Sequence, residues 1–128
     1  MGLDLHVEQK SDYLLITVSG GLDLESAKEA SQRSLKLLES HKQSKALVDC
    51  RNVAGPLSTI ERYDYATFLA DLHARYALEH GAPLRVAYVG NEPLIDPGRF
   101  GETVAVNRGA LMKVTTDIGE ARAWLGVR

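Results

Sequence analysis

Several features that assign a small protein to a class are scarce in this sequence. Cys50 is its only cysteine, so an internal disulfide cannot form, which is typical of a reducing compartment. Acidic and basic residues nearly balance, 17 against 15, and no basic run suggests a nucleic-acid partner. No apolar run approaches the roughly 20 residues that span a bilayer, and Asp4 stands where a secretory signal would carry positive charge. We therefore expect a cytoplasmic protein without a membrane span.

Common catalytic and cofactor motifs are also missing. The sequence has no Walker phosphate loop, no dinucleotide-binding glycine fingerprint and no Gly-x-Ser-x-Gly elbow. Arg51 could lower the pKa of the neighbouring Cys50 thiol, but Pro56 occupies the position of the arginine in a phosphatase signature, so a structural cysteine is favoured. Metal sites usually pair histidines four residues apart, a spacing absent from His6, His41, His73 and His80. We expect no enzyme activity, no cofactor and no metal.

The hydrophobic pattern predicts one domain over residues 1–128. A length of 128 residues is close to the commonest domain size, and 45% of the residues are hydrophobic. Apolar residues alternate over 3–8 and cluster over 13–19, which predicts two strands joined as a hairpin. Asp23 is a candidate cap for an amphipathic helix that reaches Leu38. A buried strand follows at residues 46–49.

The second half of the chain continues as strands that alternate with helices. A long helix is predicted from Ser58 to about Glu79, and a strand follows at residues 84–89. Asp96 and Pro97 have the pattern of an N-cap and a first helical residue, so we expect a third helix there that ends near residues 107–109. A short strand at 111–114 and a helix capped by Asp117 complete the chain.

This order, β-β-α-β-α-β-α-β-α, predicts an α/β fold. Strands separated by helices pair mainly in parallel, whereas the N-terminal hairpin adds an antiparallel edge strand. We expect a small mixed sheet with helices mainly on one face.

The stretch 46–61 is the candidate functional region. It contains the strand that ends in Asp49, a break at Gly55 and Pro56, and a capping box formed by Ser58 and Glu61. The start of a helix after a strand presents free N–H groups and a positive dipole end to the loop, where α/β sheets usually bind ligands. The loop at residues 90–92 also follows a strand, so it should lie beside this region. Together the two loops could form a shallow anion or polar-ligand site; helix caps and a surface salt bridge are the alternative explanation of the same residues.

Two segments resemble the STAS family, the domain of anti-sigma factor antagonists and of anion-transporter tails. They are Val18-Ser19-Gly20-Gly21-Leu22-Asp23-Leu24-Glu25-Ser26-Ala27 and the strand Leu47-Val48-Asp49, followed by Ser58-Thr59. The order of elements is also similar along the whole chain. Classical members carry Asp-Ser-Ser-Gly or Asp-Ser-Thr-Gly at the phosphorylated loop, where this chain reads Gly55-Pro56-Leu57-Ser58-Thr59-Ile60. A divergent branch groups STAS-like domains with SEC14-like lipid-binding proteins.

The resemblance implies a regulatory module that binds a protein partner, either a kinase-like anti-sigma factor or a second copy of the chain. Ser58 and Thr59 are then the phosphorylation candidates, and Arg51 and Arg62 could pair with the phosphate. Ser58 as a plain helix cap is the alternative. The SEC14-like branch implies another function, the carriage of a lipid or small apolar ligand. The residues expected to contact a partner or ligand are Asp49, Arg51, Pro56, Leu57, Arg62, Asn91, Glu92, Asp96 and Arg99.

Overall fold

The computed structural model describes residues 2–55, 57–95 and 98–127. Within them a five-stranded sheet has the order β1-β2-β3-β4-β5, in which β1 and β2 are antiparallel and the other pairs are parallel. The strands are β1 (Leu3–Gln9), β2 (Leu14–Gly21), β3 (Lys45–Ala54), β4 (Arg85–Val89) and β5 (Leu111–Thr115). The helices are α1 (Leu24–Ser40), α2 (Thr59–His80), α3 (Phe100–Asn107) and α4 (Ile118–Leu125). The predicted α/β fold class and order of elements are confirmed.

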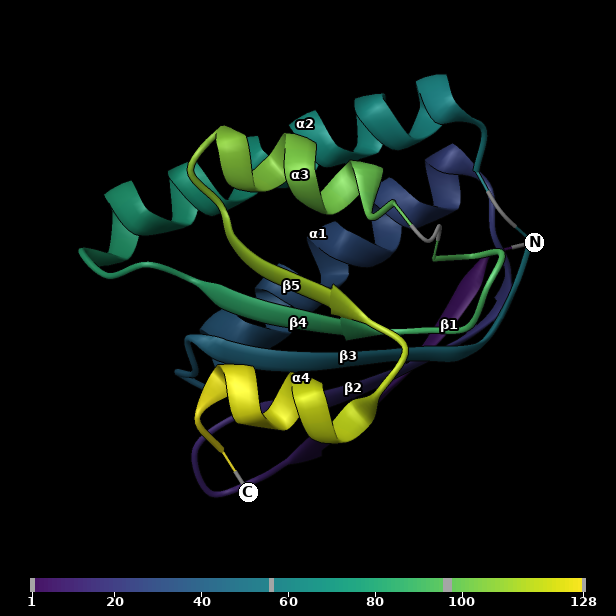
Figure 1. The fold of residues 1–128 in the computed structure, drawn as a ribbon. Helices are drawn as coiled ribbons and strands as arrows, with labels where there is room; N and C mark the ends of the chain where they lie inside the picture. Colours follow the sequence, from purple (N-terminus) through teal and green to yellow (C-terminus); the bar gives the residue numbers. More distant parts are fainter. Residues whose placement is uncertain (1, 56, 96–97, 128) are drawn as a thin grey trace.

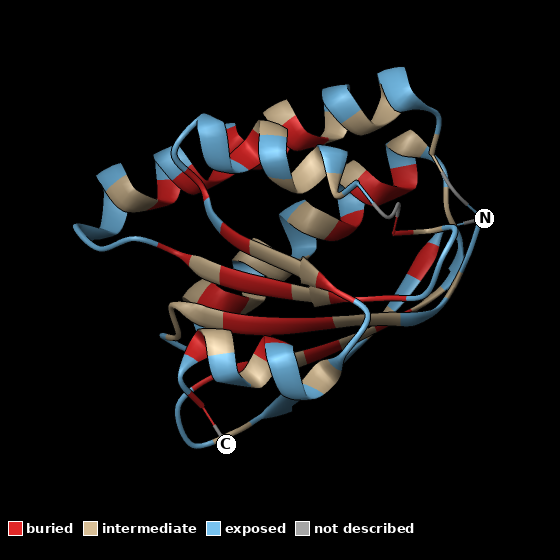
Figure 2. Ribbon diagram, viewed as in Figure 1, coloured by how far each residue is buried: buried red, intermediate tan, exposed pale blue. Residues whose placement is uncertain are grey.

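The sheet separates two layers of helices (Figure 1). Helices α1, α2 and α3 lie on one face, and α4 alone lies on the other. The larger layer packs on apolar side chains such as Ile16 and Val48, whereas α4 packs Leu125 on Leu47 and Ala87. Figure 2 shows the buried residues concentrated where the sheet meets the helices. Both interfaces follow the period-2 alternation of the strands.

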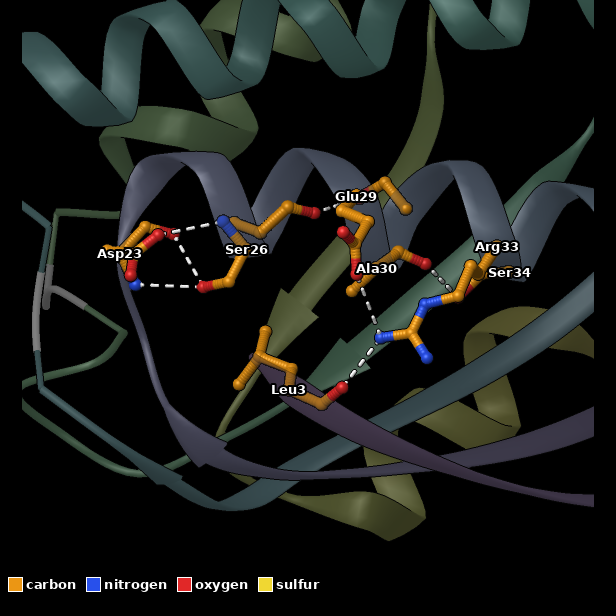
Figure 3. Close-up of polar contacts among 9 residues, drawn as sticks. Leu3, Asp23, Ser26, Glu29, Ala30, Arg33 and Ser34 are labelled. Carbon is orange, nitrogen blue, oxygen red and sulfur yellow. Dashed lines mark hydrogen bonds and ion pairs between the residues drawn. The ribbon is translucent and has the colours of Figure 1, made fainter. Parts of the chain in front are cut away.

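Helix α1 is capped at its start and hydrogen-bonded to the sheet near its middle. Asp23 accepts a hydrogen bond from the backbone N–H of Ser26 at 2.8 Å, while the Ser26 hydroxyl oxygen accepts from the backbone N–H of Asp23 at 3.1 Å. Further along, Arg33 donates to the carbonyl of Leu3 at 2.6 Å and lies 3.5 Å from Glu29 (Figure 3). The expected Asp23 cap is thus present, and Arg33 connects the helix to edge strand β1.

Two boundaries differ from the sequence prediction. Strand β3 continues beyond Asp49 to Ala54, because β2 supplies pairing partners as far as Gly21 and a bulge absorbs the change of register. Helix α3 begins at Phe100, and its cap is Arg99 with a left-handed φ of 53° and no side-chain cap bond. The expected cap Asp96 and its neighbour Pro97 lie outside the described residues.

Candidate functional site

The start of α2 carries the capping box that the sequence predicts. The Ser58 hydroxyl oxygen accepts the backbone N–H of Glu61 at 3.2 Å, and a carboxylate oxygen of Glu61 accepts the backbone N–H of Ser58 at 2.9 Å. Ser58 and Thr59 are both exposed, and Leu57 is half-buried. Pro56 lies outside the described residues. The hydroxyl of Ser58 is therefore accessible to solvent, but its oxygen already accepts a hydrogen bond from the N–H of Glu61.

Arg62 joins this helix start to the loop that follows β4. Its Nε donates to the carbonyl of Leu57 at 3.1 Å, and its Nη2 donates to the carbonyl of Pro93 at 2.8 Å. Asn91, from the same loop, donates to the carbonyl of Arg51 at 3.3 Å. The two loops therefore lie side by side, as expected for segments that leave the carboxyl ends of neighbouring parallel strands. Glu92 is exposed next to Asn91.

Arg51 is paired within its own strand. Its Nε and Nη2 donate to the two carboxylate oxygens of Asp49 at 2.9 and 2.8 Å. Hydrogen bonding from Arg51 lowers the pKa of the Asp49 carboxyl. Both arginines expected to meet a phosphate on Ser58 are thus bonded elsewhere in this structure, Arg51 to Asp49 and Arg62 to backbone carbonyls.

Arg99 is directed toward strand β5. Its Nε donates to the carbonyl of Val114 at 2.9 Å, while a carboxylate oxygen of Glu102 accepts the backbone N–H of the same residue. The backbone carbonyl and N–H of Val114 are therefore both hydrogen-bonded to side chains at the start of α3. These bonds make edge strand β5 less able to pair with a strand of another chain. Asp96, the other residue expected here, lies outside the described residues. That Arg99 contacts a ligand stays a prediction.

Exposed apolar side chains lie beside Ser58. Ile60 is 77% exposed and Tyr63 is 43% exposed. Arg108 donates to the Tyr63 hydroxyl at 2.9 Å, and its guanidinium lies 5.8 Å from the ring centroid. At the other end of the helix Leu78 is 86% exposed. Sequence reasoning missed this surface because an isolated apolar residue at a helix start looks the same whether it faces the core or solvent.

A cavity of about 190 Å³ lies between the sheet and the layer of α1, α2 and α3. Its wall is mainly aliphatic, with Leu35, Val48 and Leu69 as examples from three elements. Nothing in the sequence signals this space, because a void depends on how side chains of distant elements meet.

Polar side chains from three elements also line this cavity. Ser31 on α1 is hydrogen-bonded to the hydroxyl of Tyr65 on α2, which in turn is hydrogen-bonded to Tyr88 on β4. Burial raises the pKa of Tyr65 to about 12, so both tyrosines are neutral. These tyrosines are more than packing residues, because their hydroxyls form one connected chain across the cavity.

Cys50 and His73 line the same cavity. Burial, with a smaller effect of the Asp49 charge, raises the pKa of the Cys50 thiol to about 12. The hypothesis of a thiolate activated by Arg51 is therefore wrong, and a structural role fits. Burial lowers the pKa of His73 to about 4, and its Nδ1 has no hydrogen-bond partner among the described residues.

Three side chains gather where α1 and α2 end. His80 lies 2.8 Å from the carboxylate of Glu39, and Glu79 completes a set whose ligand atoms all lie within 4.8 Å of one another. This cluster could not be predicted from the sequence, because Glu39 is far from Glu79 and His80 along the chain. Among the described residues no helix has both the length and the apolar character to cross a membrane.

The sequence has no match among models of protein families or among curated protein sequences. Solved structures do match. One is an uncharacterised protein of the DUF3478 family with a SpoIIAA-like fold from Shewanella loihica PV-4, with 25% identity, 97% of this chain and 94% of that chain covered, and a TM-score of 0.50.

Two anti-sigma factor antagonists match over nearly the whole chain. The protein from Mycobacterium paratuberculosis has 14% identity and a TM-score of 0.60, with 98% of this chain and 95% of that chain covered. SpoIIAA in its unphosphorylated form has 11% identity and a TM-score of 0.57, with 98% and 99% covered. At such identities the likeness is one of fold, and by its fold this chain is a STAS-like domain.

Proposed function

We propose that this chain is a non-enzymatic regulatory module of the cytoplasm that binds a protein partner through the start of α2. The observation that carries the proposal is the 77% exposure of Ile60, two residues after the N-cap Ser58. An exposed aliphatic side chain contributes to binding when a partner removes it from water. The anti-sigma factor antagonists that share the fold support a partner of the kinase-like anti-sigma type. A second copy of the chain is the other candidate partner.

The loops beside Ile60 supply the polar rim of the proposed surface. Leu57 is held by Arg62, and Asn91 is held by the backbone of Arg51, so both loops are fixed in place before a partner arrives. Fixed loops reduce the conformational entropy that binding has to overcome. Glu92 lies on the same rim.

Phosphorylation of Ser58 would act on this surface. A phosphate adds a charge of about −1.5 to −2 near pH 7. The helix start favours that charge, but the carboxylate of Glu61, which bonds the Ser58 N–H at 2.9 Å, would repel it. The modified helix start would therefore exchange its capping box for a phosphate cap, which changes both the charge and the shape that a partner meets. Thr59 is the alternative acceptor.

Paired substitutions on α2 test the partner surface. Tagged wild-type protein, Ile60→Asp and Leu78→Asp are used to capture partners from the host, and the captured proteins are quantified by mass spectrometry. Both positions carry exposed aliphatic side chains on one helix, so the two variants introduce the same charge at opposite ends. We expect the partner to be retained by wild type and Leu78→Asp and lost by Ile60→Asp. Equal capture by all three proteins would rule out this surface.

The cavity favours a second candidate function, the binding of a small apolar ligand. A cavity of about 150 Å³ in another protein binds benzene, so the 190 Å³ here admits a molecule of similar or somewhat larger size. Native mass spectrometry of protein purified from its own host tests both functions at once. A bound small molecule supports ligand binding, whereas a phosphate increment or a dimer supports the regulatory module.

A further inference from the structure

We infer that the cavity between the sheet and α1–α3 selects an uncharged apolar molecule that bears a hydroxyl group, and that Nδ1 of His73 accepts that hydroxyl's hydrogen bond. The inference rests on the second candidate function and names the chemical class of the ligand. It is carried by the hydrogen-bonding state of the polar groups in the cavity wall.

His73 is a buried acceptor that the protein leaves unused. The side chain is 6% exposed, lines the cavity, and its Nδ1 has no hydrogen-bond partner among the described residues. Buried polar atoms without a partner are energetically unfavourable, so they are rare and call for an explanation.

The protonation state of His73 makes Nδ1 an acceptor. Burial lowers its pKa to about 4, so the imidazole is neutral at pH 7 and has one N–H donor and one bare nitrogen. The backbone of Leu84 raises the pKa of His73, which is the effect of a carbonyl that faces a ring N–H, whereas Nδ1 has no partner among the described residues. The bare nitrogen is then Nδ1, and its complement is a ligand that donates.

The hydroxyl donors of the cavity wall are already used inside the protein. Ser34 donates to the carbonyl of Ala30 at 2.8 Å, and Ser31 donates to that of Ala27 at 3.0 Å. Tyr65 therefore donates to the Ser31 oxygen, and Tyr88 to the Tyr65 oxygen. A ligand carbonyl would find none of these four donors available. A ligand hydroxyl, in contrast, would satisfy the acceptor of His73.

The arginines at the cavity wall make a carboxylate a poor alternative. Arg62 and Arg99 line the cavity, but they donate to the backbone carbonyls of Pro93 and Val114. A carboxylate would have to replace those bonds and lose its hydration in a mainly aliphatic space. An uncharged alcohol or phenol avoids both costs.

Binding of three probes to the wild-type protein, followed by NMR titration, tests the inference. Toluene measures apolar binding alone, p-cresol adds a hydroxyl to the same ring, and p-methylanisole replaces the hydroxyl hydrogen with a methyl group. We expect p-cresol to bind about tenfold more tightly than the other two, consistent with one buried hydrogen bond. We also expect p-cresol, and not toluene, to shift the ¹⁵N resonance of His73 Nδ1 in the wild-type protein.

Two variants assign the preference to His73. His73→Leu should bind toluene as wild type does and lose the advantage of p-cresol, whereas Ser34→Ala, which removes a hydroxyl already bonded to Ala30, should keep it. Equal affinities for p-cresol and p-methylanisole, with an unmoved Nδ1 resonance, would overturn the inference and leave the apolar binding function intact. If none of the probes binds, both the binding function and the inference fail. The wild-type resonance decides the question even if His73→Leu does not fold.

Discussion

The guanidinium of Arg62 donates to the carbonyl oxygen of Pro93 at 2.8 Å, across 31 positions of the sequence. The same side chain also bonds the carbonyl of Leu57, so one residue fixes both loops of the candidate partner surface. A single charged side chain thus connects the helix start to the neighbouring strand.

Arg62→Ala should lower the free energy of unfolding by about 2 kcal/mol, because hydrogen bonds that involve a charged group are worth about 1.5–3 kcal/mol. Chemical denaturation measures the loss, and hydrogen exchange should speed up at residues 91–95. Arg75→Ala provides the control, since Arg75 is an exposed arginine on the same helix, and its effect should stay within about 0.5 kcal/mol. Equal stabilities of the two variants would contradict the role of Arg62.

The capping box at Ser58 gives a second prediction. Ser58→Ala should destabilise the domain by about 1 kcal/mol. Ser58→Asp keeps an acceptor at the cap position, so it should destabilise the domain by only about a few tenths of a kcal/mol. Thermal unfolding compares the variants. Equal losses of stability in Ser58→Ala and Ser58→Asp would refute the contribution of the cap.

Ser58→Glu separates a regulatory role from a structural one. The added charge lies beside Glu61, so we expect affinity for the captured partner to fall by more than the change in stability explains. Binding is measured with purified partner, and circular dichroism confirms that the variant is folded. Unchanged affinity would remove phosphorylation as a gate.

Much of the fold follows from local patterns in the sequence. The caps at Asp23, Ser58 and Asp117 depend on neighbouring residues, so all three appear where expected. Gly81 adopts a left-handed φ of 70°, which glycine accepts without strain. Local chemistry is therefore sufficient for most helix ends.

The partners of the arginines could not be predicted from the sequence. Arg99 reaches Val114 and Arg62 reaches Pro93, and both contacts exist only once β4, β5 and α3 have packed. The cavity and the unpaired nitrogen of His73 depend in the same way on how distant elements meet. The sequence predicts that the two loops lie side by side, as they do, but it contains no signal for the bonds that join them.

Glu102 protects the edge of the sheet, which leads to a further prediction. Glu102→Ala leaves the N–H of Val114 without its acceptor and should cost about 1–3 kcal/mol and increase aggregation. Glu120→Ala is the control, because Glu120 makes an exposed ion pair with Lys113 at 3.6 Å, which is worth little. Light scattering during thermal unfolding distinguishes the two variants. Identical behaviour would show that β5 needs no protection.

The domain should lose stability as the pH falls from about 6.5 to 4 because of His73. Over this range the unfolded state binds a proton, with an ordinary pKa of 6.5, while the folded state does not until its lowered pKa of about 4. This difference between the two pKa values corresponds to about 3 kcal/mol in the free energy of unfolding. That stability is present above pH 6.5 and lost at pH 4. Urea unfolding across this range measures it, and His73→Leu should remove that part of the slope. A variant with the wild-type slope would contradict the assignment.

The cavity also has a volumetric consequence. A cavity of 190 Å³ per molecule corresponds to about 110 mL/mol. Unfolding eliminates such cavities, so the volume change of unfolding becomes more negative as their size increases. Hydrostatic pressure should therefore unfold this domain more readily than a domain of equal length with a filled core. A ligand that occupies the cavity would make the folded state less compressible, so pressure resistance would report occupancy without a label on either molecule.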